Sequence, residues 1–382
     1  MVRETAEHGY SCLPTFSYMI NALSVGTTYS IIVNKIDCRF MYYFLSLGPY
    51  IRGFSHMRKV ITVDDTHLYG KYESIRLSVV AQNTENHIYP IAFCVVDKEN
   101  DASWTFFFEK LKPIVVDGPD LYFISDRHKS IANGIAKAYN DAHHRYCMRN
   151  LGENLWVNHH CGEHLYLFYN AAKAYSSEEF SDHFMEFKNY CPEVAFFLEH
   201  ELGFEKWSRA YFPGNRFDVM TTNIAELVNA ILIDEREYPM ASIFNSIAKR
   251  FDEIFRERCA YGLKCKDNKF VPTAKNILRD NMSEGDSFYV ENISGDKRQY
   301  TMFGSGCTVK VDLLERSCSC RKFDLVKIPC VHAMAALRLK HGEYYGLRVY
   351  DYSSPMYKVE EYLLAYSESI NVFPLEYEWR MP

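Results

Sequence analysis

Several common features are missing from this sequence, and each absence narrows what the chain does. No run of about 18 apolar residues is present, which argues against a transmembrane helix. The opening residues, MVRETAEHGYSC, lack the apolar core of a signal peptide, so we expect a soluble, intracellular protein. No G-x-S-x-G elbow, Walker loop or Rossmann glycine pattern occurs, so hydrolase, NTPase and dehydrogenase functions have no support.

The composition is that of a folded globular chain. Of its 382 residues, 48% are hydrophobic and 15% aromatic, and this length predicts two or three domains. The net charge of −6 argues against a protein that coats nucleic acid indiscriminately. Residues 240–340 nevertheless carry 18 Lys/Arg against 12 Asp/Glu. That basic middle fits a nucleic-acid-facing module beside a metal-bearing domain, and it fits solvated helix faces equally well.

Three carboxylates occupy positions where α/β proteins place their chemistry. The β-branched run VITV at 60–63 predicts a buried strand that ends at Asp64 and Asp65. The segment LYFISDRH predicts a strand that ends at Asp126, and TTNIAELVNAIL predicts a helix with Glu226 near its start. If the three converge at one sheet edge, their oxygens suit divalent metal ions for phosphoryl chemistry.

The first half of the chain predicts a mixed sheet. LPTFSYMINAL has helical spacing, and YSIIVNKIDCRFMYYFLSLG predicts a strand followed by a helix. From residue 58 the order is β-β-β-α-β-α. A polar turn at Asn83–Asn86 joins two strands, Ser103 is the predicted N-cap of the following helix, and HRYCMRNL predicts a further short strand. This is the order of a ribonuclease-H-like fold, in which the first and fourth strands carry neighbouring carboxylates, so the predicted fold class is α/β.

Changes in sequence texture predict six segments. Residues 151–220 are helical in pattern and rich in Tyr, Phe and Glu, and short strands begin near residue 285. The segments are a leading α/β element (1–57), a ribonuclease-H-like core (58–150), an all-helical insertion (151–220), a region that carries the Glu226 helix (221–284), a small C-terminal zinc domain (285–345) and a tail (346–382).

The clearest motif is a cluster of cysteine and histidine. Cys318, Cys320, Cys330 and His332 form two tight pairs separated by nine residues. Four such ligands fit a tetrahedral structural Zn²⁺ site, and the alternative is a set of reduced structural cysteines. A looser group lacks paired ligand spacing, so we expect solvent-exposed loop residues, with a second zinc site as the alternative. It comprises His143, His144, His159, His160, Cys161 and His164.

Segments of this chain resemble two known families. The spacing and flanks of VDLLERSCSCRKFDLVKIPCVHAMAAL resemble the SWIM-type zinc finger, a module frequent in Mutator-like (MULE) transposases. VITVDDTHLYGKY is similar to the V-D-G-T-h-L-x-G-x-Y segment of MULE transposases, and FISDRHKSI to their I-S-D-R-x-x-G-I motif. PIAFCVVDKENDASWTFFFEKL and KWSRAYFPGNRFDVMTTNIAELVNAILIDEREYPM resemble further segments of that family. The resemblance runs from about residue 10 to about residue 350.

The resemblance to MULE transposases implies a DDE triad of Asp64, Asp126 and Glu226, separated by 62 and 100 residues. Two Mg²⁺ or Mn²⁺ ions would act there in cutting and joining DNA phosphodiesters. Trp207 would stack on an unpaired base, with a core anchor of the insertion as the alternative. Arg127 would contact phosphate, with a carboxylate partner as the alternative.

The sequence departs from the family pattern in three places. Cys147 is followed by Asn150 where the family commonly has C-x-x-H, and Asp65 stands where it usually has Gly. Asp65 adds a like charge beside Asp64 unless it points to the opposite face of the strand. The residues before 57 show no Cys/His spacing of the DNA-binding zinc domain that many such transposases carry.

The leading hypothesis is therefore a MULE-type transposase or a protein derived from one. Its expected partners are transposon ends and target DNA, protein partners through the SWIM module, and a second copy of the chain, and its expected location is the nucleus. The competing hypothesis is a domesticated DNA-binding regulator that keeps the fold without catalysis. A SWIM-containing interaction adaptor is a third possibility, which leaves the acidic residues unexplained.

Overall fold

The computed structural model describes residues 6–159, 161–213, 219–291, 295, 298–304 and 307–371. It divides into two compact units, which are considered one at a time. The first comprises Met1–Ala142, Thr222–Lys266 and Glu360–Pro382, and the second comprises His143–Thr221 and Asp267–Val359. Among the helices of the described residues, none combines the length and the apolar character needed to cross a membrane.

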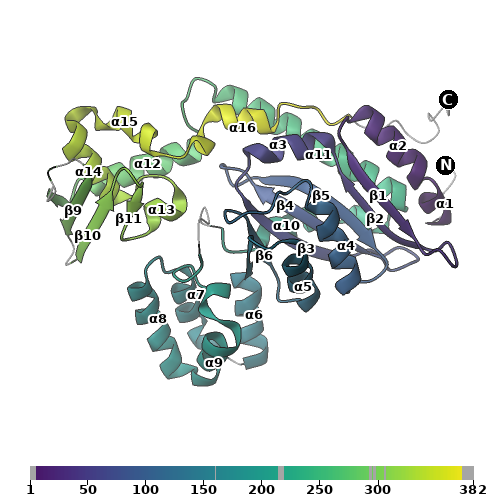
Figure 1. Cartoon of the computed structure of the whole chain (residues 1–382), viewed down its shortest axis with the longest axis horizontal. Coiled ribbons are helices and arrows are strands. Elements are labelled where there is room, and N and C mark those ends of the chain that lie inside the picture. The colour runs from purple at the N-terminus through teal and green to yellow at the C-terminus, as the bar shows by residue number, and fades with distance from the viewer. Residues whose placement is uncertain are drawn as a thin grey trace. The chain divides into compact units, whose positions relative to one another are not determined.

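The main structural feature is a mixed sheet of seven strands in the order β1-β2-β5-β4-β3-β6-β7 (Figure 1). The strands are β1 (Thr28–Val33), β2 (Phe40–Ser46), β3 (Val60–His67), β4 (Ile75–Gln82), β5 (Ile88–Val96), β6 (Tyr122–Ser125) and β7 (His143–Tyr146). Strand β3 pairs antiparallel with β4 and parallel with β6. The hairpin predicted around Asn83–Asn86 is confirmed, since β4 and β5 pair antiparallel on either side of that turn.

Residues 40–46 form strand β2, so the predicted helix in this region is wrong. The segment FMYYFLS is rich in aromatic residues, which favour strands, and it pairs antiparallel with both β1 and β5. Its side chains alternate between the two faces of the sheet: the Tyr43 ring contacts Phe244 of α11 (Met240–Lys264), whereas the Phe44 ring contacts Phe107 of α4 (Asp101–Leu111). Burial on both faces explains why the segment lacks a clear alternation of apolar and polar residues.

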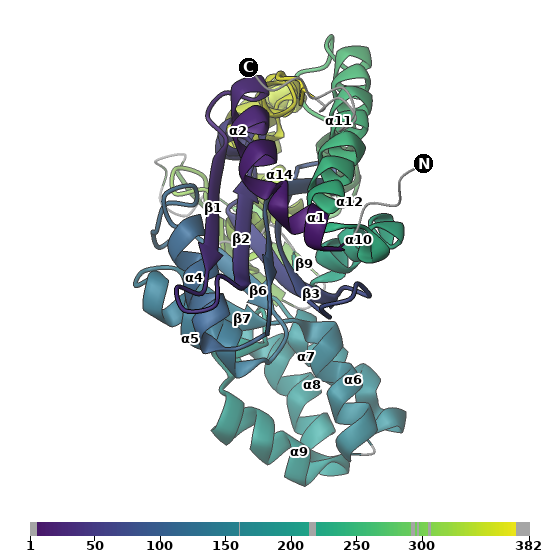
Figure 2. The same cartoon turned by 90° about the vertical axis from the view of Figure 1, so that its right-hand side faces the viewer.

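Helices cover both faces of this sheet (Figure 2). Helices α4 and α5 (Lys129–Ala138) lie on one face, while α2 (Leu13–Leu23), α10 (Asn223–Ile231) and α11 lie on the other. Helix α4 buries an apolar stripe of Trp104, Phe107, Phe108 and Leu111.

The N-cap of α4 is Asn100 rather than the predicted Ser103. The Asn100 side chain accepts hydrogen bonds from the backbone N–H groups of Ala102 and Ser103, and the Ser103 side chain accepts one from the Asn100 N–H. This reciprocal pair is a capping box. Ser103 therefore does stabilise the helix start, but from its third position.

The second unit contains a helical segment and a small sheet. The helical segment comprises α6 (Met148–His159), α7 (Leu165–Lys173), α8 (Ser177–Tyr190) and α9 (Pro192–Phe196). The small sheet has the order β11-β10-β9-β8 and is antiparallel throughout, with β8 (Tyr289–Glu291), β9 (Gln299–Gly304), β10 (Cys307–Asp312) and β11 (Ser317–Cys318). Helices α12 (Pro272–Gly285) and α14 (Val331–His341) also belong to this C-terminal part. The short strands predicted after residue 285 are thus confirmed.

Candidate acidic site and zinc centre

The pairing of β3 with β6 brings two of the predicted carboxylates to one end of the sheet. Val60 pairs with Tyr122 and Thr62 with Ile124, a constant offset of 62 residues. The same offset separates Asp64 from Asp126, which follows the last residue of β6. Because parallel neighbours keep this register, Asp126 emerges beside Asp64. The prediction that the strand ends at Asp64 and Asp65 is wrong, since β3 continues to His67 in its pairing with β4.

The third carboxylate, Glu226, lies in the first turn of α10, as predicted. One turn later on the same helix, Asn229 donates a 2.8 Å hydrogen bond from its side-chain amide to Asp64 Oδ2 and a 3.3 Å bond to the Asp65 carbonyl. Residues three apart share a helix face, so Glu226 is on the side of α10 that faces Asp64. Strand pairing, hydrogen bonds and charge effects therefore link all three predicted carboxylates to the part of β3 around Asp64.

The sequence analysis missed Asn229 and Arg76. Arg76, on β4, is fully buried and donates a 2.9 Å hydrogen bond from Nη2 to the Asn229 side-chain carbonyl. This bond orients the Asn229 amide so that its N–H₂ group faces Asp64. The available signals were a polar residue one turn after Glu226 and an arginine within an otherwise apolar strand.

The electrostatics around Asp64 are dominated by carboxylates that are buried close together. Burial and the neighbouring charges of Asp65, Asp126 and Glu226 raise the pKa of Asp64 to about 8. Burial, together with the charges of Glu99 and Asp126, raises the pKa of Asp65 to about 7. A protein normally keeps such groups close together only where a cation or a function requires it.

Asp65 interacts with a different set of side chains from Asp64. Successive strand residues face opposite sides of a sheet; Asp64 bonds to α10, while Asp65 lies within electrostatic reach of Glu99 and His128. Glu99 Oε1 accepts a 3.1 Å hydrogen bond from Trp104 Nε1 and lies 3.1 Å from His128 Nδ1. The backbone N–H of His128 donates to Asp126 Oδ1 at 3.1 Å. Sequence reasoning assigned no role to Glu99 or His128.

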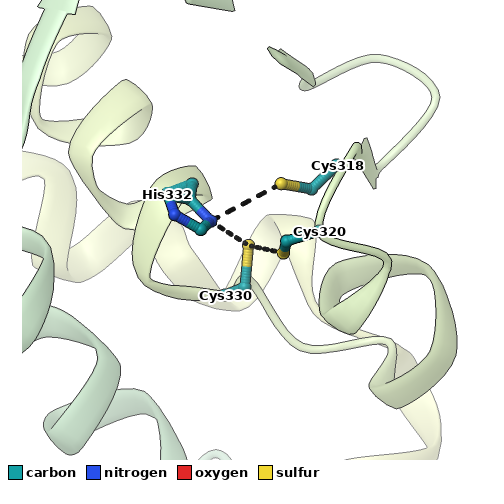
Figure 3. A group of neighbouring side chains, drawn as sticks. All are labelled: Cys318, Cys320, Cys330 and His332. Carbon is teal, nitrogen blue, oxygen red and sulfur yellow. Dashed lines mark hydrogen bonds between the residues drawn. The ribbon is translucent and has the colours of Figure 1, made fainter. Parts of the chain in front are cut away.

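The zinc ligands are already gathered (Figure 3). Cys318 Sγ lies 3.7 Å from His332 Nδ1, Cys320 Sγ lies 3.7 Å from Cys330 Sγ, and Cys330 Sγ lies 4.0 Å from His332 Nδ1. With Zn–S bonds of about 2.3 Å and Zn–N bonds of about 2.0 Å, the corners of a tetrahedral site lie roughly 3.5–3.8 Å apart. The observed separations fit Zn²⁺ with His332 bound through Nδ1.

Local structure around the ligands explains this arrangement. Cys318 ends β11, and its backbone N–H donates to Asp324 Oδ2 at 3.0 Å. Cys330 is the N-cap of α14, so His332 lies in the first turn of that helix. Burial raises the pKa of the Cys330 thiol to about 12, and a bound zinc ion would favour the thiolate that burial disfavours.

The acidic residues are less tightly gathered than the zinc ligands. Among the residues that the structure describes, Cys318, Cys320, Cys330 and His332 are the only group of three or more potential ligands whose donor atoms all lie within 4.8 Å of one another. Asp64, Asp126 and Glu226 influence one another through their charges at longer separations.

Comparison with protein families finds a match in each of these two regions. Residues 60–154 match the model of the MULE transposase domain, and residues 307–341 match the model of the SWIM zinc finger. The chain carries a MULE transposase domain and a SWIM zinc finger. The MULE match includes Asp64 and Asp126, and the SWIM match includes all four zinc ligands. Among curated proteins, none matches the chain.

Trp207 lies outside the MULE match and is fully buried. Its indole N–H donates to the Leu198 carbonyl at 3.2 Å, and its ring packs against Phe168, Phe180 and Phe184. A ring without exposed surface has no face on which a base can stack. The structure therefore favours the core-anchor alternative for Trp207 over the predicted nucleic-acid contact.

The other polar candidates have more local surroundings. Arg127 is half-buried in the short loop between β6 and α5. Cys147 is buried, and its thiol donates to the side-chain carbonyl of Asn150 at 3.4 Å, so these two residues form a hydrogen-bonded pair at the start of α6. Of the group suggested as a second zinc site, His160 lies outside the described residues, and the others do not form a compact ligand group in the part that the structure describes.

Proposed function

We propose that this protein cuts and joins DNA phosphodiesters with Asp64, Asp126 and Glu226 as ligands of two divalent metal ions. Two observations together carry the proposal. The chain contains a MULE transposase domain, and three carboxylates are linked to the part of β3 around Asp64. Burial, together with the charges of Asp65, Asp126 and Glu226, raises the pKa of Asp64 to about 8, which supports a site that is completed by cations.

The sheet supports a ribonuclease-H-like core. Strands β3, β4 and β5 are consecutive and antiparallel, α4 follows, and β6 then pairs parallel with β3. This arrangement places the first and fourth strands of the core side by side, with Asp64 within β3 and Asp126 directly after the end of β6. Strands β1 and β2 extend the same sheet beyond β5. In this view the helical segment from α6 to α9 is the insertion before the Glu226 helix.

The donor set fits Mg²⁺ or Mn²⁺. These ions prefer carboxylate oxygens, and the carboxyl groups of Asp64 and Asp65 both have raised pKa values because too much negative charge is buried together. When bound, the ions would supply charge neutralisation at the scissile phosphate and a water or 3′-hydroxyl of lowered pKa. The chain's own contribution is orientation: Arg76 holds Asn229, and Asn229 holds Asp64.

We propose that the SWIM finger binds a structural zinc ion and contributes contacts to DNA or to protein partners. Four protein ligands close the site, which is typical of zinc that stabilises a fold rather than zinc that performs chemistry. The competing function is that of a DNA-binding regulator without catalysis. The Cys147–Asn150 pair, where the family commonly has C-x-x-H, is the observation that keeps this alternative in view.

The test is Mn²⁺-dependent cleavage of DNA that carries the ends of the transposon to which this chain belongs. Wild-type protein should cleave it, Asp126→Asn should lose cleavage by at least about a thousandfold, and Asp120→Asn should cleave normally because Asp120 is exposed in a loop of the same unit. If wild-type protein binds zinc and DNA but leaves the DNA intact, the regulator is the better account.

A further inference from the structure

A cavity of about 680 Å³ lies at the end of strands β3 and β5, entirely within the first unit. Its lining comes from α1 (Ala6–Ser11), from the start of β2, from the loop after β3 and from the loop between β5 and α4. Its volume is within the range of about 300–1,000 Å³ that is typical of small-molecule sites. Neither the proposed metal site nor the zinc site uses it.

One wall of the cavity is aromatic. The Tyr10 ring centroid lies 4.7 Å from that of Phe40 and 5.4 Å from that of Tyr72, with interplanar angles of 52° and 77°. Tyr72 is 44% exposed, and its hydroxyl donates to Glu7 at 3.0 Å, which fixes the ring. A ring that is held in place and partly exposed is a platform on which a planar heterocycle can stack.

The cavity adjoins the acidic site. Glu99 lines the cavity, and the same carboxylate contacts His128 and raises the pKa of Asp65. His67, another lining residue, follows Asp64 by three positions on β3. At about 3.3 Å per strand residue, this places His67 roughly 10 Å from Asp64 along β3.

The polar lining selects the class of occupant. The lining carboxylates Glu7, Glu73, Asp97 and Glu99 offer acceptors, whereas Arg39 and Lys98 are the lining cations. The ammonium of Lys71 lies 5.4 Å from the centre of the Tyr72 ring. This excess of carboxylates disfavours a phosphate group inside the cavity and favours a neutral ligand that donates hydrogen bonds. Amino-bearing nucleobases meet both requirements of a flat ring and N–H donors, while thymine has no amino group.

We infer that this cavity receives an unpaired, amino-bearing nucleobase of the DNA strand next to the scissile phosphate, with Tyr72 as a stacking surface. The inference rests on the proposed function, because it takes DNA as the substrate. It also supplies the stacking role for which buried Trp207 is unsuited. Moving a base out of the duplex costs least at an end or a junction, where a transposase acts.

A binding cycle tests this inference without requiring cleavage. The full chain is mixed with duplexes that have a short 3′ overhang, with Ca²⁺ in place of Mg²⁺, and the junction nucleotide is cytosine, thymine or an abasic analogue. Tyr72→Ala should weaken binding of the cytosine duplex by at least about fivefold and leave binding of the abasic duplex unchanged. Wild-type protein should bind the cytosine duplex more tightly than the thymine duplex.

Two further variants act as controls. Tyr72→Phe keeps the ring but loses the bond to Glu7, so it should weaken binding of the cytosine duplex less than Tyr72→Ala does. Tyr18→Ala removes a tyrosine that is 65% exposed on α2 outside the cavity and should bind like wild type. A Tyr72→Ala protein that binds every duplex like wild type, or that weakens the cytosine and abasic duplexes equally, overturns the inference. If the binding cycle shows the expected pattern but the protein cleaves no DNA, the result supports base binding in the cavity and contradicts the proposed DNA cleavage. Failure of wild-type protein to bind any duplex contradicts both.

Discussion

The zinc centre and the acidic site differ in how much of each is assembled by the protein alone. In the zinc centre, four ligands from one stretch of 15 residues have donor atoms within 4.8 Å of one another. In the acidic site, the ligands come from β3, the end of β6 and α10, and their shared charge opposes close approach. Thiols and imidazole can be neutral before they bind a metal, whereas ionised carboxylates repel one another until a cation arrives. In the proposed function, zinc would therefore consolidate a preformed centre in one region, and divalent ions would draw together dispersed carboxylates in the other.

Removal of zinc should have the largest effect. Structural zinc contributes on the order of 10 kcal/mol to the folding of small zinc domains. Cys330→Ser, or treatment with a strong chelator, should therefore abolish zinc binding and unfold the SWIM finger. Metal analysis and limited proteolysis between residues 285 and 345 measure this, and Cys259→Ser, on α11 of the first unit, is the matched control. Retention of a protease-resistant finger without zinc would show that the centre does not depend on its metal.

The core role of Trp207 predicts the next largest effect. Trp207→Ala should destabilise the second unit by about 3–5 kcal/mol, because it leaves a cavity among buried aromatic rings. Trp156→Ala should be nearly neutral, since Trp156 is 61% exposed on α6. Chemical denaturation of both variants measures the difference. Equal stabilities would contradict the assignment of Trp207 to the core.

Asn229 tests how the acidic site is held before the metal binds. Asn229→Ala should lower Mn²⁺-dependent cleavage by about 10–100-fold, the usual effect of removing a residue that orients a metal ligand. Asn223→Ala, an exposed position in the first turn of the same helix, is the control. Normal cleavage by Asn229→Ala would show that the hydrogen bond to Asp64 is not needed for orientation.

The smallest expected effect is a change of stability with pH, which tests the repulsion between the carboxylates of the acidic site. The raised pKa of about 8 for Asp64 means that the folded, metal-free protein holds a proton that the unfolded chain releases near pH 4. Stability from this group is thus fully present below about pH 4 and is lost as pH rises towards 8. The melting temperature should fall by a few degrees across that window, and Mn²⁺ should raise it more at pH 8 than at pH 6. Asp64→Asn should weaken both trends, and the raised pKa of Asp65, about 7, should account for what remains. A Mn²⁺ effect that is independent of pH would contradict the account.

The contrast between the zinc centre and the acidic site also explains which residues could be predicted from the sequence. The zinc ligands were found because tetrahedral ligands in two tight pairs leave a pattern in the local sequence. Asp64, Asp126 and Glu226 were proposed from strand and helix ends together with family resemblance. The contacts of Asn229 with Asp64 and of Glu99 with His128 join residues on different elements, and no local pattern marks such pairs. Sheet register and helix packing must be known before they can be seen.

Two errors in the predicted fold have equally local causes. Residues 40–46 lie in the interior of the sheet and are apolar on both sides, so the period of two that distinguishes a strand from a helix is absent. At the start of α4, Asn100 and Ser103 are both good capping residues, and their reciprocal hydrogen bonds decide which one is the N-cap.

The most direct test of the central claim is a crystal structure of the protein soaked with Mn²⁺, with anomalous diffraction measured at the manganese edge. The account predicts manganese peaks bound by Asp64, Asp126 and Glu226 and drawn-in carboxylates around them, with zinc at the Cys₃His centre and no manganese peaks in Asp126→Asn. Ordered zinc together with no manganese beside Asp64 would contradict the claim that metal ions complete the acidic site.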